Sequence, residues 1–131
     1  MTKLANVEEI HFYPKEGSFD VEAAAAAIAS IGFSYRDPHV PQMFLIFDNA
    51  ESRERCREVR EDDPYASLPH VLLIRVEPDE VYINQFAGER FDEYARAFVT
   101  WLLATYSCRV FNDFGKQITD LTVDSTDVPQ P

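Results

Sequence analysis

Four arginines crowd the segment SRERCREVREDD, residues 52–63, of a chain whose formal net charge is −11. If this segment is a helix, its turn of about 100° per residue places Arg53, Arg57 and Arg60 within about 60° of one another. Three guanidinium groups on one helix face could clamp the phosphates of a nucleic acid or dock a partner protein.

Acidic residues in the same segment offer a simpler interpretation. Residues 51–63 hold six acids against four arginines, so the segment as a whole is negative. Opposite charges that stand three or four positions apart stabilise a helix by roughly 0.2–0.5 kcal/mol per pair. Three pairs have this spacing: Glu54/Arg57, Arg57/Glu61 and Glu51/Arg55. We therefore favour a solvated, self-paired face over a partner-docking face, and both over a nucleic-acid clamp.

The third side of this polar helix is nearly free of charge. Ser52, Cys56 and Val59 form a thin apolar seam there, which can rest on a sheet. Asp48, three residues before Glu51, resembles the first residue of a capping box. The helix is therefore expected to have an arginine face, an acidic stripe and an apolar side that packs on the sheet.

No set of residues forms a catalytic motif. His11 could act with Cys108 or with an acid, but a single histidine on a strand is more often hydrogen-bonded than catalytic. His70 directly follows a proline at the start of a predicted strand, and His39 stands between prolines in a predicted loop. We expect a protein without catalytic activity.

Cofactor and metal signatures are equally weak. The four glycines form no glycine-rich phosphate loop, and Gly115 with Lys116 lacks the rest of a P-loop. Cys56 and Cys108 match no Cys/His zinc spacing. The segment 112–115 could offer oxygens to a cation, but without the spaced acids of a calcium loop it is typical of a turn. Neither a cofactor nor a metal is expected.

Length and composition indicate one folded domain. The chain has 131 residues, of which 46% are hydrophobic and 27% charged. The 23 acids against 12 bases create a field that repels phosphate backbones and anionic lipids and favours basic partners. The N-terminus lacks a signal-peptide pattern, and the apolar runs are far shorter than a membrane span. We expect a cytoplasmic protein with reduced thiols.

The predicted elements follow the order β-α-β-β-α-β-β-α-β. Alternation over 7–13 places Ile10 and Phe12 on one side of the first strand. One helix begins at Ser18 or Asp20 and ends at Gly32, and the strongest helix spans 91–106. Further strands are predicted at 33–36, 42–48, 70–76 and 80–86, with a hairpin turn at 77–80, and residues 108–120 are predicted to form a strand, a turn and a short return strand.

This order predicts an α+β domain with a mainly antiparallel sheet, partly ferredoxin-like. Two amphipathic helices are expected on one face of the sheet, together with one polar helix. The domain is predicted to span residues 1–120, and residues 121–131 to form a polar, flexible tail.

The other face of the sheet raises a question of coverage. The strands 42–48 and 70–76 are predicted to be apolar on both faces, which requires a second cover. The polar helix, the C-terminal segment, a second copy of the chain or a different partner could provide it. Tyr13, Tyr82 and Phe86 would lie on that face, where aromatic rings could also stack RNA bases, although the acidic field opposes RNA binding.

The C-terminal third, FDEYARAFVTWLLATY followed by CRVFNDFGKQITD, resembles the end of small acidic immunity-type proteins found beside bacterial polymorphic toxins. This resemblance implies a non-enzyme that binds a cognate toxin tightly, with acidic residues facing a basic active site. The net acidity and the uncovered sheet face agree with that implication.

The leading prediction is thus a protein-binding module, of immunity type, that acts by occlusion and charge complementarity on a basic protein. The alternative is a small-ligand-binding or regulatory domain with a pocket between helix and sheet, which dimerises through its sheet; an enzyme ranks third. Neither a nucleic acid nor a membrane is expected as partner. The expected partner-binding residues are Glu54, Glu58, Glu61, Asp62, Asp63, Tyr82 and Phe86.

Overall fold

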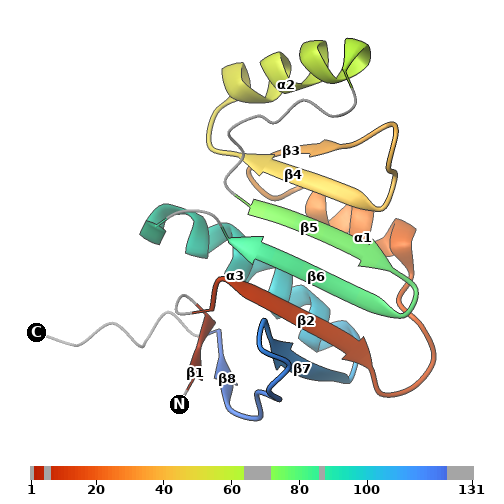
Figure 1. The fold of residues 1–131 in the computed structure, drawn as a ribbon, viewed down its shortest axis with the longest axis vertical. Helices are drawn as coiled ribbons and strands as arrows, with labels where there is room; N and C mark the ends of the chain where they lie inside the picture. Colours follow the sequence, from red (N-terminus) through yellow and green to blue (C-terminus); the bar gives the residue numbers. More distant parts are fainter. Residues whose placement is uncertain (1, 5–6, 64–71, 86–87, 124–131) are drawn as a thin grey trace, which may run out of the picture.

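The computed structural model describes residues 2–4, 7–63, 72–85 and 88–123, and for residues 85 and 88–92 it describes the backbone alone (Figure 1). The helices are α1 (Val21–Ile28), α2 (Ala50–Asp62) and α3 (Gly88–Thr105). The strands are β1 (Thr2–Lys3), β2 (Glu9–Pro14), β3 (Phe33–Arg36), β4 (Met43–Phe47), β5 (Leu72–Glu77), β6 (Glu80–Gln85), β7 (Cys108–Asn112) and β8 (Leu121–Thr122).

Six of these strands form one sheet with the order β3-β4-β5-β6-β2-β7, in which every neighbouring pair is antiparallel. The predicted α+β class and the predicted succession of elements from β2 to β7 are confirmed. The hairpin of β5 and β6 turns at residues 77–80 as expected. The ferredoxin-like detail stays a prediction.

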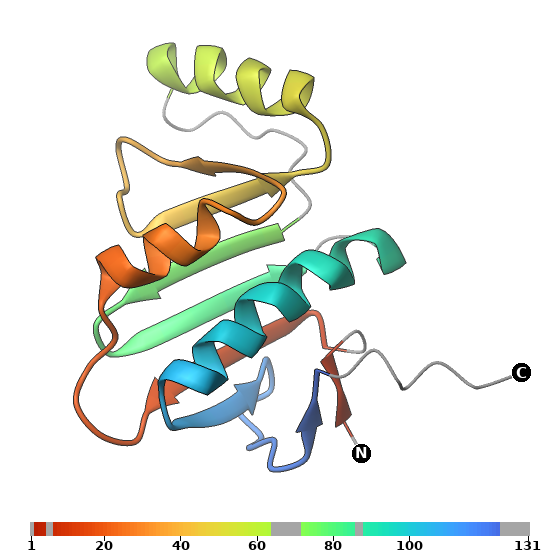
Figure 2. The same cartoon turned by 180° about the vertical axis from the view of Figure 1, so that it is seen from behind.

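Helices α1 and α3 lie side by side across one face of the sheet (Figure 2). Alternate strand residues point into this layer, so Ile10 and Phe12 of β2 are fully buried. Asp20 caps α1 by accepting hydrogen bonds from the backbone N–H groups of Glu22 and Ala23. The main core therefore forms between the sheet and these two helices.

Helix α2 covers part of the opposite face. Cys56 of α2 is fully buried in a small cluster with Tyr35, Leu45 and Phe47 from β3 and β4. Strand β4 is thus apolar and buried on both faces, as predicted. Among the four covers considered from sequence, the polar helix is the one that lies over this end of the sheet.

The prediction that the strand at 70–76 is apolar on both faces is wrong. In β5, Leu72, Ile74 and Val76 are buried, whereas Leu73, Arg75 and Glu77 are only partly buried. The strand therefore has the period of two that is typical of a sheet with one wetter face. Beyond β4, the face that carries α2 is mixed in polarity, not a large apolar patch.

The C-terminal boundary also differs from the prediction. Leu121 and Thr122, assigned from sequence to the tail, form β8 and pair in parallel with Thr2 and Lys3. Val123 packs against the main core as well. Residues 124–131 lie outside the described part of the chain. Within that part, no helix combines the length and the apolarity needed to cross a membrane.

Candidate functional site

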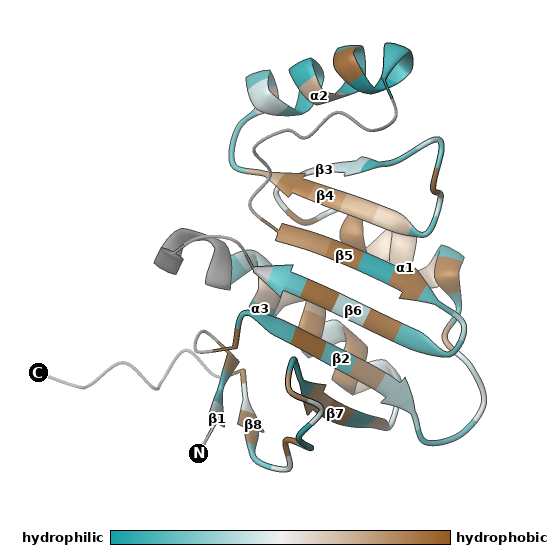
Figure 3. Cartoon of the chain, in the orientation of Figure 1, coloured by the Kyte–Doolittle hydropathy of each residue, from teal (hydrophilic) through white to brown (hydrophobic). Residues whose placement is uncertain are grey.

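The outer surface of β5, β6, β2 and β7, on the side away from α1 and α3, is called the open face here, and Figure 1 looks onto it. Hydrophilic and hydrophobic residues alternate along β6 and β2 (Figure 3), because alternate side chains point to opposite faces. The register places four side chains in one row across the open face: Arg75, Tyr82, His11 and Phe111.

Glu80, the first residue of β6, is the centre of a polar network on this face. Its Oε2 accepts a hydrogen bond from the Tyr13 hydroxyl at 2.8 Å and lies 3.1 Å from His11 Nδ1. Its Oε1 accepts a hydrogen bond from an Arg75 terminal nitrogen at 3.0 Å. One carboxylate from β6 therefore holds three side chains that come from β2 and β5.

The burial and hydrogen bonds of this network act in opposite directions on the Glu80 carboxyl. Burial by itself would raise the pKa of Glu80, but the hydrogen bonds from Tyr13, His11 and Arg75 outweigh it and lower that pKa. The same hydrogen bond to Glu80, with some burial, raises the pKa of Tyr13. Glu80 is thus an anion at neutral pH and Tyr13 a neutral donor.

A second cluster adjoins the first. The Tyr82 hydroxyl donates to Glu9 Oε1 at 3.0 Å, and Asn84 Nδ2 lies 3.0 Å from the Tyr82 oxygen. Burial and the hydrogen bond to Glu9 raise the pKa of Tyr82. The Arg75 guanidinium lies over the Tyr82 ring, 5.2 Å from its centroid, in a cation–π arrangement. Side chains from three strands are therefore locked together over the middle of the open face.

A small pocket ends the open face at β7. The Tyr13 and Phe111 rings meet edge to face there, with their centroids 5.5 Å apart. The pocket has a volume of about 350 Å³ and is lined by His11, Tyr13, Phe111, Asn112, Asp113 and Gly115. It is named the aromatic pocket below.

The turn beside this pocket is built by Asn112. Its side-chain oxygen accepts from the backbone N–H groups of Phe114 and Lys116 at 3.0 and 2.9 Å. Gly115 takes φ = 78°, which glycine adopts without strain. The turn presents Phe114 with 88% of its surface exposed. The segment predicted as a turn is thus a turn, and it carries an exposed aromatic ring.

The arginine-rich helix α2 is only partly a self-paired face. The predicted pairs Glu54/Arg57 and Glu51/Arg55 are present, at 3.3 Å each. Arg60 instead is buried and forms an ion pair with Asp37, which is fully buried. The prediction of three solvated arginines on one face is therefore wrong for Arg60.

Arg53 and the N-cap residue show how the first turns of α2 are held. Arg53 lies over the Phe33 ring of β3, 5.6 Å from its centroid, and also contacts Glu54. The N-cap is Asn49, whose side chain accepts from the Ser52 N–H at 2.7 Å, and not Asp48 as the sequence suggested. Arginines of α2 thus attach the helix to β3 and to the loop that follows it.

Those predicted partner-binding residues that the structure describes fall on one side of the sheet. Helix α2 packs on Leu45 of β4, and Leu45 pairs with Leu73 on the face that also carries Tyr82. Glu58, Glu61, Asp62 and Asp63 are exposed, and Glu54 is half-exposed beside Arg53 and Arg57. Phe86 lies outside the described residues. The acidic helix therefore borders the open face at the β3–β4 end.

The candidates for catalysis do not come together. Cys108 pairs with Pro14 and packs toward the main core, whereas His11 pairs with Phe111 on the open face. Burial raises the pKa of both Cys56 and Cys108, which disfavours the reactive thiolate. His39 Nε2 lies 3.0 Å from the Arg60 carbonyl oxygen, and His70 lies outside the described residues.

Among the described residues, no group of three or more His, Cys, Asp or Glu side chains could hold a metal ion.

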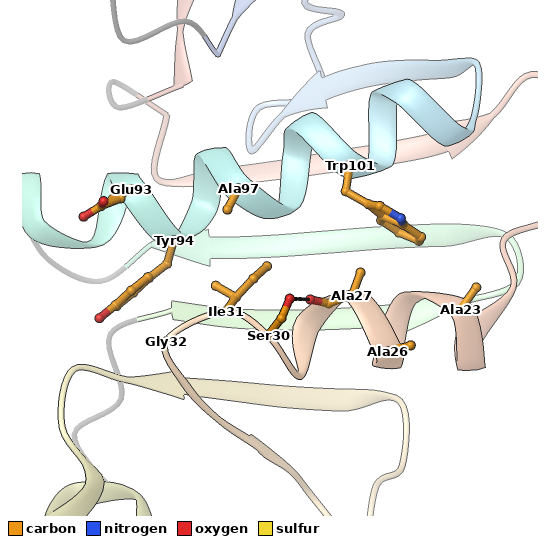
Figure 4. Close-up of a pocket in the computed structure, with 10 residues that line it drawn as sticks. All are labelled: Ala23, Ala26, Ala27, Ser30, Ile31, Gly32, Glu93, Tyr94, Ala97 and Trp101. Carbon is orange, nitrogen blue, oxygen red and sulfur yellow. Dashed lines mark hydrogen bonds between the residues drawn. The ribbon is translucent and has the colours of Figure 1, made fainter.

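A groove of about 760 Å³ lies between α1 and α3 (Figure 4). Small residues of α1 such as Ala23 and Ala27 line one wall, and Tyr94 and Trp101 of α3 line the other. The alternative prediction placed a pocket between helix and sheet, but this groove lies between two helices.

Comparisons with protein-family models, with curated proteins and with solved structures find no match for this chain. The resemblance to immunity-type proteins therefore stays a prediction.

Sequence reasoning missed the centre of the site. The sequence pattern predicts Glu80 as part of the turn after β5 and Arg75 as part of an apolar strand. The signal that could have found them is the register of the predicted hairpin, because Glu77 pairs with Glu80 and Arg75 with Tyr82. Phe111 and Phe114 were likewise treated only as parts of a strand and a turn.

Proposed function

We propose that this protein is a non-catalytic binding module that engages a basic protein through its open face, with the acidic helix α2 beside that face. The observation that carries the proposal is the network around Glu80. It fixes Tyr13, His11 and Arg75 in place on a surface that neither α1 nor α3 covers. Tyrosine and arginine are the residue types enriched in the energetic centres of interfaces.

Preorganisation supports the same proposal. A side chain that is already held in one rotamer loses less entropy when a partner orders it, and loosely held side chains cost roughly 0.5–1.5 kcal/mol each. The Tyr82 hydroxyl and the Arg75 guanidinium are both held in the free protein, by Glu9 and by Glu80. The open face therefore suits tight binding better than a surface of free side chains would.

Charge supports the choice of a basic partner. The exposed acids of α2 add to a chain of net charge −11, and such a field raises the association rate of a cationic protein. A toxin-neutralising immunity protein in the cytoplasm is the specific form of this proposal, supported by the resemblance of the C-terminal third.

The decisive experiment is capture of a partner from the source cells at low and at high salt, followed by affinity measurement with variants. Tyr82→Ala should weaken binding of the captured protein by about thirtyfold or more, as expected of an interface centre. Leu103→Ala, which removes an exposed side chain of α3 on the other side of the molecule, is the matched control and should leave affinity unchanged. Equal affinities for the two variants would remove the open face from the proposal.

Electrostatic steering has a separate test. Glu58→Lys with Glu61→Lys should slow association with the basic partner and flatten its salt dependence. Glu93→Lys on α3 is the matched control for Glu58→Lys alone, because it changes the net charge by the same amount and its side chain is exposed on the opposite layer. Unchanged association rates in the α2 variant would exclude α2 as the steering surface.

The second candidate function is a regulatory domain that dimerises through its sheet and binds a small ligand. The groove between α1 and α3 is the observation that favours a ligand. Solution mass measured by light scattering separates the candidates, since a concentration-independent dimer that Tyr82→Ala converts to a monomer would favour self-association. A monomer that binds one basic protein would favour the first proposal.

A further inference from the structure

The aromatic pocket combines three features that suit a cation. The ring faces of Tyr13 and Phe111 carry negative electrostatic potential, and a cation within about 6 Å of such a ring is attracted to it. Asp113, an exposed acid, is among the residues that line the pocket. The volume of about 350 Å³ is at the lower limit for a small-molecule site, so the pocket suits one side chain better than a whole ligand.

The open face already contains an example of this chemistry. On the opposite side of His11, the Arg75 guanidinium lies 5.2 Å from the Tyr82 ring centroid and reaches the Glu80 carboxylate at 3.0 Å. An aromatic ring and a carboxylate thus hold one guanidinium there. Tyr13 and Asp113 offer the same pair of groups at the aromatic pocket, where the six lining residues include neither arginine nor lysine.

We infer that the aromatic pocket takes an arginine side chain of the basic partner, which stacks on the Tyr13 and Phe111 rings and pairs with the Asp113 carboxylate. This inference rests on the proposed function, because it names the group by which that partner is recognised. Arginine fits better than lysine, since its planar guanidinium can stack on a ring and bond a carboxylate through two N–H groups at once.

Neighbouring residues set how that side chain enters. Tyr13 is fixed by its hydroxyl bond to Glu80, so the pocket is formed before binding. Arg109 pairs with Tyr13 in the register and is exposed, which adds a positive charge on that side. A second guanidinium must therefore approach from the turn, past Asp113.

The test uses two short peptides that differ in one group. Acetyl-Gly-Arg-Gly-amide and its citrulline analogue have nearly the same shape, but citrulline is neutral. Each is titrated into the full-length protein at low salt while NMR follows the Tyr13 and Phe111 rings and the Gly115 amide. The arginine peptide should shift these signals with a dissociation constant on the order of millimolar, and citrulline should bind about tenfold more weakly.

Variants locate the site. Asp113→Asn should weaken binding of the arginine peptide severalfold, whereas Asp62→Asn on α2, an equivalent change of an exposed acid, should not. Phe111→Leu should abolish the shift of the Tyr13 ring signals while the remaining spectrum shows an intact fold. Equal binding of arginine and citrulline peptides, or an equal effect of the two aspartate variants, would overturn the inference.

The outcome is separable from that of the proposed function. If the arginine peptide binds in the aromatic pocket but Tyr82→Ala leaves the captured partner unaffected, the pocket stands and the proposed function fails. If Tyr82→Ala weakens the partner but arginine and citrulline bind alike, the function stands and the arginine assignment fails.

Discussion

Removal of the Asp37 carboxylate is expected to be among the most destabilising single changes in this protein. Asp37 is fully buried, and its ion-pair partner Arg60 is 7% exposed. The same carboxylate accepts from the backbone N–H groups of His39 and Val40 at 2.8 and 3.3 Å. Asp37→Ala therefore removes the buried carboxylate that pairs with the Arg60 guanidinium and the acceptor that orders the loop after β3.

The magnitude follows from that burial. Removing one partner of a buried ion pair costs about 3–5 kcal/mol, because the other charge stays desolvated. A folded domain is stable by only about 5–15 kcal/mol, so the variant should remain folded but be marginal. At roughly 3–4 °C per kcal/mol for a chain of this length, the melting temperature should fall by about 10–20 °C.

A double-mutant cycle tests the reasoning. Arg60→Met keeps the apolar stem and removes the charge, and Asp37→Ala with Arg60→Met removes both charges. Since an apolar replacement of a whole buried pair is often nearly neutral, the double variant should be more stable than Asp37→Ala alone. Urea unfolding, followed by Trp101 fluorescence, provides the four free energies. Additive losses in the double variant would refute the assignment of a coupled buried pair.

Three further predictions concern the site and the core. Glu80→Gln should lower the free energy of unfolding by about 1–3 kcal/mol at pH 7. Folding lowers the pKa of Glu80, so the stability that its carboxylate contributes is complete above the unfolded pKa near 4.3 and is lost as the pH falls through the folded pKa. Denaturation curves of the wild type and the variant should therefore converge in acid. Gly32→Ala should lower the free energy of unfolding by about 1–2 kcal/mol, because φ at this position is +50° and the new Cβ would lie 3.0 Å from the Tyr94 ring and from the Ile46 Cγ2 methyl group. An unchanged melting temperature would contradict this. Cys108 should react with a thiol reagent in the native protein, whereas Cys56, fully buried, should react only on unfolding.

Local periodicity predicted most of the fold. Ile10 and Phe12 alternate with polar residues, and α3 repeats its apolar residues at helical spacing, so both elements could be found without knowledge of the rest of the chain. In β5 the run Leu72–Ile74 hid the alternation, because Leu73 is apolar for a separate reason. It packs against the small cluster under α2, a contact that depends on tertiary structure.

The candidate site was harder to predict because its contacts join distant parts of the chain. Tyr13 and Glu80 are 67 residues apart, and Arg60 and Asp37 are 23 apart. The first pair depends on the pairing of β2 with β6, and the second on how α2 packs against β3 and β4; a single sequence specifies neither. The predicted N-cap of α2 was one residue too early for a local reason. Asp48 and Asn49 are both residue types that cap helices well, and the backbone of Asn49 has the extended conformation that an N-cap requires.

These contacts explain why a helix that carries four arginines still presents a mainly acidic surface. Arg60 is neutralised by a buried aspartate, and Arg53 lies over Phe33 of β3. Arg57 is held by Glu54. Helix α2 therefore uses its arginines mainly to attach itself to the sheet and to pair internally, while its C-terminal acids remain exposed. A partner that approaches the open face meets the acidic field of α2 on one side and the aromatic pocket on the other, which is why a basic surface with a projecting arginine is the chemistry we expect.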